Sequence, residues 1–428
     1  MKYIISTLGC KVNQYETQAI EALLLAHGHK AAAEDERADA VIVNSCAVTA
    51  ESGRKTRQLI RRLHEENPEA VIAVCGCYSQ LEPESVKALG ARVVFGAAER
   101  TKFVAAVERA VAEGEETALI DKPFERRVFE EMPAGALGGR TRAMLKIQDG
   151  CVNFCSYCII PYTRGRLRSL PIESACAETA RLAAEGYREL VLTGIEVASY
   201  GVDLPGKPGL ADVVAAIGEV SGDMRIRLGS LEPTVITDEF CEKVAAGGKL
   251  CRHFHLSLQS GCDKTLRAMN RKYDTAAFFA VTERLRRAFP GCALTTDLIT
   301  GFPGETEEDH AETLAFIEKC AFADMHIFPY SRRPGTKADA MENQCTAAVK
   351  SRRAAEAQAV AARMRDAYLA ENIGAALPVL FESGDGAGSV GHSDNYLKVR
   401  VADEGLHGQV KTVKITAVSG QELVGFTV

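Results

Sequence analysis

Three cysteines within eight residues, Cys151, Cys155 and Cys158, are the strongest chemical signal in the sequence. Thiolates at this spacing can hold three irons of a four-iron, four-sulfur (4Fe–4S) cluster, because thiolate is the soft ligand that such clusters bind. The run supplies no fourth ligand, which leaves one iron open, as a catalytic metal site requires. Gly150 and Gly165 flank the run and let the chain fold tightly around a bulky ligand. The alternatives are unrelated buried cysteines or half of a zinc site, although zinc usually takes a second cysteine pair elsewhere.

Four more cysteines follow strand-like segments near the start of the chain. Apolar, β-rich runs span residues 3–8, 40–44, 71–74 and 92–95. They alternate with helical stretches, two of which Asn13 and Thr49 can cap, and this alternation predicts an open parallel sheet. Cysteines follow the first three strands, at Cys10, Cys46 and the pair Cys75 and Cys77. Because open parallel sheets bind ligands at the carboxyl ends of their strands, three of these thiols can form a second site. Chance placement of small buried cysteines is the alternative.

The rest of the chain predicts two further domains. After a first domain at 1–115 and a linker at 116–139, six strand candidates alternate with helices through residues 140–372. They lie at 143–147, 190–193, 225–228, 254–258, 294–299 and 325–328. Six β/α units fit a partial barrel, whose chemistry lies at the carboxyl ends of its strands, and the cysteine run follows the first strand. Residues 373–428 change to short alternating strands with turn signals, which predicts a small β-barrel.

Composition narrows the class of protein. The 428 residues are 46% hydrophobic and 25% charged, with a net charge of −6, so any nucleic-acid binding must come from local patches. The N-terminus is too soon interrupted for a signal peptide, and no apolar run is long enough to span a bilayer. Fourteen cysteines in such a chain indicate reduced thiols and metal ligation, hence a cytoplasmic protein with no membrane partner.

The text from Gln148 to Arg166, with Tyr157 before the last cysteine of the run, resembles the methylthiotransferase branch of the radical S-adenosylmethionine enzymes. Three earlier segments, 7–13, 44–49 and 74–80, resemble the cluster motifs of the N-terminal domain of that family. In the family the third ligand follows a glycine, which favours Cys77 over Cys75, although Cys75 stays open as the alternative. The resemblance therefore implies two 4Fe–4S clusters, bound by Cys10, Cys46 and Cys77 and by the cysteine run.

The family also implies a binding site for S-adenosylmethionine, one iron chelating its amino and carboxylate groups. Polar and glycine-rich segments at the ends of the second, fourth and fifth strands of the barrel resemble the sequences that form this pocket in the family. With Tyr157, the expected contacts are Thr193, Gly194, Ser257, Gln259, Asp297 and Ile299. The sequence departs from the double-glycine-glutamate text of many radical enzymes, because Thr193-Gly194-Ile195 stands in its place. Each segment alone is also consistent with an ordinary turn between strand and helix.

The reaction that the resemblance implies converts an inert C–H bond into C–SCH3. The cluster of the cysteine run and S-adenosylmethionine generate a 5′-deoxyadenosyl radical. The cluster of Cys10, Cys46 and Cys77 holds the inserted sulfur, and a second S-adenosylmethionine gives the methyl group. The text from Gly9 to Thr17 is closest to the subgroup that modifies C2 of threonylcarbamoyladenosine at position 37, beside the tRNA anticodon. Isopentenyladenosine and a ribosomal protein aspartate are the alternative substrates, and a non-catalytic iron–sulfur RNA-binding or electron-transfer protein is the alternative class. The electron donor and the sulfur source are unidentified partners.

Two further segments predict contact with RNA. Arg164, Arg166 and Arg168 alternate just after the cysteine run, and alternate residues of an extended segment face one way. Three guanidiniums beside the active site can grip phosphates, with a solvated edge or ion pairs as the alternative. The text from Gly391 to Val399 resembles the terminal TRAM domain of the family, which is associated with RNA binding.

Overall fold

The computed structural model describes residues 1–33, 36–135 and 140–428, so the last four residues of the predicted linker lie outside the described residues. Contacts divide the chain into two units. Unit 1 comprises Met1–Gly138, Met144–Leu170 and Ser331–Asp339, and unit 2 comprises Gly139–Ala143, Pro171–Tyr330 and Ala340–Val428. The domain boundaries predicted from the sequence stay predictions.

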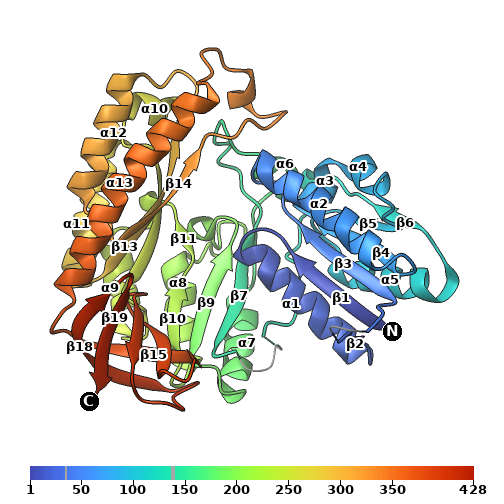
Figure 1. The fold of residues 1–428 in the computed structure, drawn as a ribbon, viewed down its shortest axis with the longest axis horizontal. Coiled ribbons are helices and arrows are strands. Elements are labelled where there is room, and N and C mark those ends of the chain that lie inside the picture. Colours follow the sequence, from blue (N-terminus) through green and yellow to red (C-terminus); the bar gives the residue numbers. More distant parts are fainter. Residues whose placement is uncertain (34–35, 136–139) are drawn as a thin grey trace. The chain divides into compact units, whose positions relative to one another are not determined.

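Unit 1 is built on a sheet of six parallel strands (Figure 1). In spatial order they are β2 (Lys30–Ala31), β1 (Lys2–Thr7), β3 (Ala40–Ser45), β4 (Val71–Gly76), β5 (Val93–Phe95) and β6 (Thr117–Leu119). Every residue of β3 and β4 is buried, as expected for parallel strands that are covered on both faces. The predicted open parallel sheet is confirmed, and its four predicted strands correspond to β1, β3, β4 and β5.

Helices cover both faces of this sheet. They are α1 (Lys11–Ala26), α2 (Ala50–Glu66), α3 (Cys77–Leu81), α4 (Pro83–Lys87) and α5 (Arg100–Glu113). Apolar side chains of α1 and α5 pack together on one face, and those of α2 and α4 on the other. Thr49 caps α2 as predicted, because its hydroxyl accepts a hydrogen bond from Ser52 N at 3.0 Å. The prediction that Asn13 caps α1 is wrong, since the helix already begins at Lys11 after Cys10.

The cysteine run lies in a later part of unit 1, between a strand and a short helix. The elements here are η1 (Pro123–Glu125), β7 (Arg142–Asp149), α6 (Ile160–Arg164) and β8 (Arg168–Ser169). Strand β8 pairs antiparallel with the end of β7, so the chain leaves β7, passes through the cysteines and α6, and returns to the same strand. The first two residues of β7 belong to unit 2.

Unit 2 carries the other strands of the partial barrel. They are β9 (Glu189–Gly194), β10 (Arg225–Leu228), β11 (Ser230–Leu231), β12 (His253–Gln259), β13 (Ala293–Thr300) and β14 (Asp324–Pro329). Strands β9 and β10 pair in parallel, and β11 to β14 form a second parallel set. With β7, these strands include all six predicted β/α strands, so the prediction of a partial barrel is confirmed.

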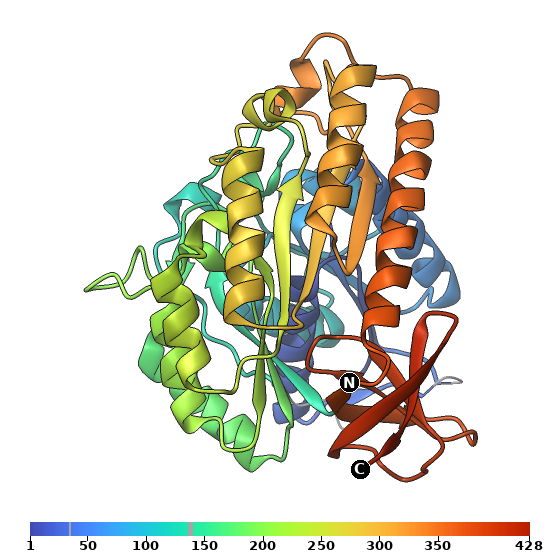
Figure 2. The same cartoon turned by 90° about the vertical axis from the view of Figure 1, so that its left-hand side faces the viewer.

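Helices separate the strands of unit 2 (Figure 2). They are α7 (Ile172–Ala184), α8 (Leu210–Val220), α9 (Asp238–Ala246), α10 (Asp263–Ala268), α11 (Thr275–Ala288), α12 (Glu307–Cys320) and α13 (Ala347–Glu371), with shorter turns η2 (Val197–Ser199), η3 (Pro233–Val235) and η4 (Lys337–Ala340). Hydroxyl and carboxylate caps begin several of them, for example Asp274 at α11 and Thr306 at α12. Such caps stabilise the first turn by accepting from unpaired backbone N–H groups.

The C-terminal residues of unit 2 form a closed five-stranded barrel, as predicted. Its strands are β15 (Ala376–Gly384), β16 (Ser389–Ser393), β17 (Lys398–Val401), β18 (Val410–Ser419) and β19 (Glu422–Thr427). Val379, Phe381, Val399 and Val413 fill its interior. Strand β16 was not among the predicted strands, and it closes the barrel between β15 and β17.

A buried carboxylate joins this small barrel to the rest of unit 2. Glu189, at the start of β9, accepts from Arg225 Nε at 2.6 Å and from Arg227 Nε at 2.8 Å. The same arginines donate to backbone carbonyls of the barrel, at Pro378 and Asp394. Burial alone would raise the pKa of Glu189, but the arginine charges lower it to about 2. The carboxylate therefore holds two guanidiniums in the orientation that docks the barrel.

We predict that Glu189→Gln lowers the free energy of unfolding of unit 2 at neutral pH. Removing one partner of a buried ion cluster leaves guanidinium charge uncompensated, which costs about 3–5 kcal/mol. Because the folded pKa lies below the usual value of 4.5, this contribution is present above about pH 4.5 and is lost as the pH falls toward 2. Urea unfolding of the purified protein at pH 7 and at pH 3 measures both effects.

Glu318→Gln is the matched control, because its ion pair with Arg363 at 3.2 Å is exposed on both sides. This change should alter the free energy of unfolding by less than about 1 kcal/mol. Equal effects of the two substitutions at pH 7 would contradict the role assigned to Glu189.

Candidate iron–sulfur centres

Strands β1, β3 and β4 bring Cys10, Cys46 and Cys77 to one edge of the unit 1 sheet. Strand β3 pairs in parallel with both neighbours, so the three carboxyl ends lie side by side. Cys10 precedes α1, Cys46 follows β3 directly, and Cys77 is the first residue of α3. Burial raises the pKa of Cys10, and the neighbouring Cys77 and Cys46 thiols raise it further. The structure therefore gathers the predicted trio, whose role as ligands stays a prediction.

Two glycines allow the close approach of these loops. Gly76 precedes Cys77 and has a φ of +107°, and a Cβ on it would lie 2.4 Å from Ser45 O. Gly9 precedes Cys10 with a φ of +127°, and its Cβ would lie 3.1 Å from Cys46 Cβ. A side chain at Gly76 would push two cysteine-bearing loops apart, and one at Gly9 would crowd Cys46 in a backbone conformation that favours glycine.

Two buried asparagines hold the loops at this edge. Asn13 donates through Nδ2 to Leu8 O at 3.1 Å and to Ser45 O at 2.9 Å. Its Oδ1 faces Cys10 Sγ at 3.6 Å, and Asn44 Nδ2 donates to Asn13 O at 2.9 Å. In the sequence, Asn44 stands out as a polar residue at the end of an apolar strand. Its hydrogen-bond partner, Asn13, could not be identified from the sequence.

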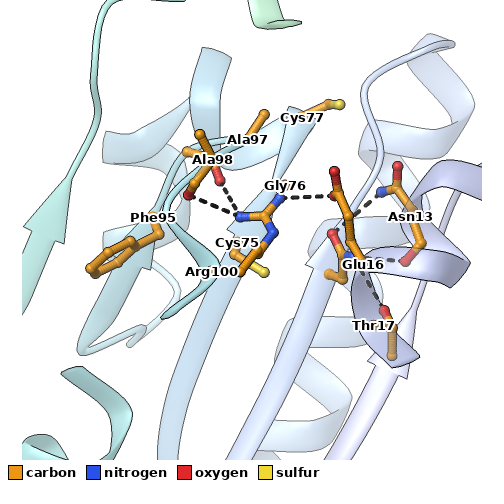
Figure 3. A network of polar contacts seen from close by, with 12 residues as sticks. Asn13, Glu16, Thr17, Cys75, Gly76, Cys77, Phe95, Ala97, Ala98 and Arg100 are labelled. Carbon is orange, nitrogen blue, oxygen red and sulfur yellow. Dashed lines mark hydrogen bonds and ion pairs between the residues drawn. The ribbon is translucent and has the colours of Figure 1, made fainter. Parts of the chain in front are cut away.

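Cys75 and Cys77 have different surroundings although they are two residues apart. Cys75 lies inside β4, fully buried among the apolar side chains packed with α1 and α5, and burial raises its pKa to about 11. Cys77 belongs to the apolar cluster on the other face of the sheet, with side chains of α2 and α4, and Figure 3 labels both cysteines. Cys77 Sγ instead accepts a hydrogen bond from Arg164 Nε at 3.3 Å. These surroundings favour Cys77 as the ligand and Cys75 as a core residue.

A cluster of buried charges lies directly behind the trio. Glu16 of α1 accepts from Arg100 Nη2 at 2.9 Å, from Lys146 Nζ at 3.3 Å and from both Nη atoms of Arg164. Arg100 also donates to the carbonyls of Gly96 and Ala98 (Figure 3). Burial alone would raise the pKa of Glu16, but the three cations hold it well below its usual range. No sequence pattern pointed to Glu16, because a glutamate in a helix is normally exposed.

The contiguous run Cys151, Cys155 and Cys158 forms a loop that two backbone hydrogen bonds hold in place. Cys151 N donates to Gly165 O at 3.0 Å, and Cys158 N donates to Cys155 O at 2.9 Å. Gly150 has a φ of +79°, and a Cβ there would lie 1.8 Å from Arg166 O. The glycine is thus required where the loop folds back on itself, as the sequence suggested. All three thiols are of intermediate exposure, so a ligand can reach them.

The expectation that Arg164, Arg166 and Arg168 face outward together is wrong for two of them. Arg164 ends helix α6 and is 0% exposed, and Arg168 is 3% exposed and pairs with Asp149 at 3.2 Å. The segment is not a continuous extended strand, so the assumed alternation does not hold. Arg166 alone is exposed and donates to Phe124 O at 3.3 Å.

The residues expected to contact S-adenosylmethionine lie at carboxyl ends of strands in unit 2, apart from Tyr157, which belongs to unit 1. Thr193 and Gly194 end β9, Ser257 and Gln259 end β12, and Asp297 and Ile299 lie toward the end of β13. Gln259 has a φ of +70°, next to a register shift between β12 and β13.

Neighbouring side chains fix the end of β12 and orient Asp297. His255 Nε2 lies 3.2 Å from Asp297 Oδ2 and its Nδ1 lies 2.9 Å from Thr295 Oγ1. Tyr273, which sequence reasoning missed, donates to Leu258 O at 2.8 Å. The contacts of these strand ends with S-adenosylmethionine stay predictions.

Comparisons with known proteins identify the family. Residues 145–317 match the Radical SAM superfamily, and residues 2–96 match the Uncharacterized protein family UPF0004. The threonylcarbamoyladenosine tRNA methylthiotransferase MtaB of Bacillus subtilis (strain 168) is 38% identical over 96% of this chain and 92% of that protein. The chain belongs to the radical S-adenosylmethionine methylthiotransferase family. Another relative of this methylthiotransferase is the tRNA-2-methylthio-N(6)-dimethylallyladenosine synthase of Carboxydothermus hydrogenoformans, 38% identical over 83% of this chain and 82% of that protein.

A solved structure supports the fold of the methylthiotransferase. The radical S-adenosylmethionine methyltransferase TsrM from Kitasatospora setae superimposes with a TM-score of 0.57 over 79% of this chain and 77% of that chain, at 16% identity. This likeness concerns the fold alone. No helix within residues 1–33, 36–135 and 140–428 combines the length and apolar character needed to cross a membrane.

Membership of the radical S-adenosylmethionine superfamily implies a 4Fe–4S cluster and S-adenosylmethionine as cofactors of this methylthiotransferase, a transferase of sulfur-containing groups. Cys151, Cys155 and Cys158 fit that cluster, because reduced thiols on a tight loop supply three soft ligands within reach of solvent.

We predict that Gly76→Ala disrupts the edge that carries Cys77. Its new Cβ would meet Ser45 O at 2.4 Å and Asn44 Oδ1 at 2.6 Å, so β4 and β3 must separate there. We expect the free energy of unfolding to fall by about 2 kcal/mol or more. Iron bound per chain after anaerobic reconstitution should fall with it, because Cys77 is displaced.

Gly28→Ala is the control for backbone strain. Gly28 also has a positive φ, +80°, but a Cβ there has no neighbour within 4 Å. This substitution should cost only about 1–2 kcal/mol and leave the bound iron unchanged. Equal loss of iron in both variants would show that the crowding at Gly76 has no special role.

Proposed function

We propose that the enzyme transfers a methylthio group to C2 of N6-threonylcarbamoyladenosine at position 37, in the anticodon loop of tRNA. The observation that carries this proposal is the 38% identity to the threonylcarbamoyladenosine enzyme of Bacillus subtilis across 92% of that protein. The dimethylallyladenosine synthase is equally identical but matches over less of its length, which makes isopentenyladenosine the second candidate substrate. An unstacked anticodon-loop base is accessible in the way that sequence-specific RNA recognition favours.

The two trios of cysteines have different proposed roles. Cys151, Cys155 and Cys158 would hold the cluster that binds S-adenosylmethionine, and Cys10, Cys46 and Cys77 a second 4Fe–4S cluster that provides the inserted sulfur. When loaded and given one electron by the electron donor, the first site would supply a 5′-deoxyadenosyl radical, which can abstract a hydrogen atom from a carbon that no acid–base pair could deprotonate. Both trios belong to unit 1, and the thiols of the second gather at one sheet edge, which supports this division of labour.

The S-adenosylmethionine contacts are proposed at the strand ends already described. Thr193 and Gly194 would face its methionyl amino group, Ser257 and Gln259 its ribose and carboxylate, and Asp297 and Ile299 its adenine, with Tyr157 in the cluster loop. Chemistry in β/α barrels lies at the carboxyl ends of strands, where all but Tyr157 are found.

The partners follow from the same reaction. Arg166 is the one arginine of its segment that is exposed and able to meet an RNA phosphate. The C-terminal barrel is the second proposed contact with tRNA, through its likeness to the TRAM domain. An electron donor and a sulfur source must also interact with the enzyme. A cytoplasmic location is proposed because tRNA is modified there.

We predict that Cys155→Ala abolishes formation of 5′-deoxyadenosine, because the open-iron cluster loses a ligand. Cys77→Ala should still form 5′-deoxyadenosine but give no methylthiolated product. Purified variants are reconstituted anaerobically with iron and sulfide, and then supplied with reductant, S-adenosylmethionine and tRNA. Chromatography with mass spectrometry quantifies both products.

Cys75→Ala is the matched control, since it removes a thiol two residues away that lies in the core. It should keep both products. If Cys75→Ala instead stops methylthiolation while Cys77→Ala does not, the choice of ligand is wrong. Absence of 5′-deoxyadenosine from the unsubstituted enzyme would overturn the radical mechanism.

We predict that deleting the gene removes 2-methylthio-N6-threonylcarbamoyladenosine from cellular tRNA and leaves the unmethylthiolated nucleoside in its place. Mass spectrometry of digested tRNA measures both nucleosides. Re-expression of the unsubstituted chain should restore the product, and re-expression of Cys155→Ala should not. Loss of the methylthiolated isopentenyladenosine instead would favour the second candidate substrate.

A further inference from the structure

Arg164 connects the two cysteine trios of unit 1. It lies six residues after Cys158, at the end of α6, and its side chain is fully buried. Its Nε donates to Cys77 Sγ at 3.3 Å, across 87 residues of sequence. Arg164, six residues beyond the contiguous run, therefore donates to a sulfur of the scattered trio formed by Cys10, Cys46 and Cys77.

The orientation of this guanidinium is fixed by its other partners. Glu16 accepts from Nη1 and Nη2 together, the bidentate arrangement that matches the planar fork of arginine. Nη2 also lies 3.4 Å from Asn13 Oδ1, and Asn13 itself frames Cys10. With both Nη groups engaged, Nε is the donor left to face Cys77.

The buried charges around Arg164 do not balance by themselves. Four buried cations, Arg100, Lys146, Arg164 and Arg168, share two buried carboxylates, Glu16 and Asp149. These six groups alone carry an excess of two positive charges, which the part-exposed carboxylates of Glu130, beside Arg100, and Asp121, near Arg168, offset only in part. Burying uncompensated charge is costly. Beyond Glu16 and Asp149, the group placed to supply further negative charge to Arg164 is the Cys77 sulfur, as a thiolate bound to metal. The network is thus complementary to an anionic cluster at the scattered trio.

We propose that Arg164 is a positioning residue for the cluster held by Cys10, Cys46 and Cys77, to which it donates an N–H···S hydrogen bond that makes the cluster easier to reduce. The inference rests on the proposed function, because it requires the second cluster. Hydrogen bonds to cluster sulfurs and nearby positive charge both stabilise the more negative, reduced state. Its guanidinium also ties the segment after the contiguous run to the scattered trio.

The test uses the full chain with Cys151, Cys155 and Cys158 changed to Ala, so that bound iron reports on the scattered trio alone. After anaerobic reconstitution, a redox titration followed by electron paramagnetic resonance gives the midpoint potential. Adding Arg164→Gln should lower the equilibrium constant for one-electron reduction at least tenfold, a shift of about 59 mV to lower potential. The fold should tolerate the change, because Glu16 keeps Arg100 and Lys146 as partners.

Arg166→Gln on the same background is the matched control, since it removes an exposed arginine two residues away. Its midpoint potential should equal that of the background chain. The proposal is overturned if Arg164→Gln leaves the potential unchanged or if Arg166→Gln shifts it equally. If Arg164→Gln takes up no iron, Arg164→Lys decides, because it keeps the charge but not the fork: a lower potential supports the proposal and an equal one overturns it.

One outcome separates this inference from the function on which it rests. If the background chain with Arg164 intact takes up no iron, the second cluster itself fails, and the inference falls with it. If that chain binds a cluster whose potential does not respond to Arg164, only the inference fails.

Discussion

The carboxylate of Glu16 is the point on which the architecture of unit 1 depends. It receives Arg100 from α5, Lys146 from β7 and Arg164 from α6, three elements that are far apart in sequence. A buried ion cluster of this kind is weak evidence for net stability, because desolvation offsets much of the attraction. Its effect is geometric: the cations can be buried only where the carboxylate meets them. The helix that starts at the first cysteine-bearing loop is thereby joined to the segment that carries the contiguous run.

Parallel-sheet topology made the thiol sites predictable from sequence. Cysteines that follow successive strands must meet at one edge when those strands are neighbours, and β1, β3 and β4 are neighbours. The same logic identified the strand ends of the partial barrel, and Thr49 was recognised as a cap because hydroxyls commonly begin helices. These inferences used local patterns together with one rule about where ligands bind.

What the sequence could not show depends on partners far away in the chain. Arg164 and Arg168 were expected to face outward with Arg166 because alternate residues of an extended segment face one way, and ion pairs were the alternative. The ion pairs with Glu16 and Asp149 explain their burial. Asn13 was taken for a helix cap, whereas its amide is used by the loops at Leu8 and Ser45. Strand β16 was missed because its residues, Ser389 to Ser393, lack the apolar alternation that marks a strand.

The two trios also differ in how far they depend on folding. A contiguous run can present three thiols from one short loop, whereas Cys10, Cys46 and Cys77 meet only after three strands have paired. Metal binding at a scattered site is therefore coupled to the free energy of folding of the sheet. The hydrogen bond from Arg164 to Cys77 extends that coupling to α6. Loading of the scattered trio should consequently favour the folded arrangement of the segment that follows the contiguous run, so that one site helps to order the surroundings of the other.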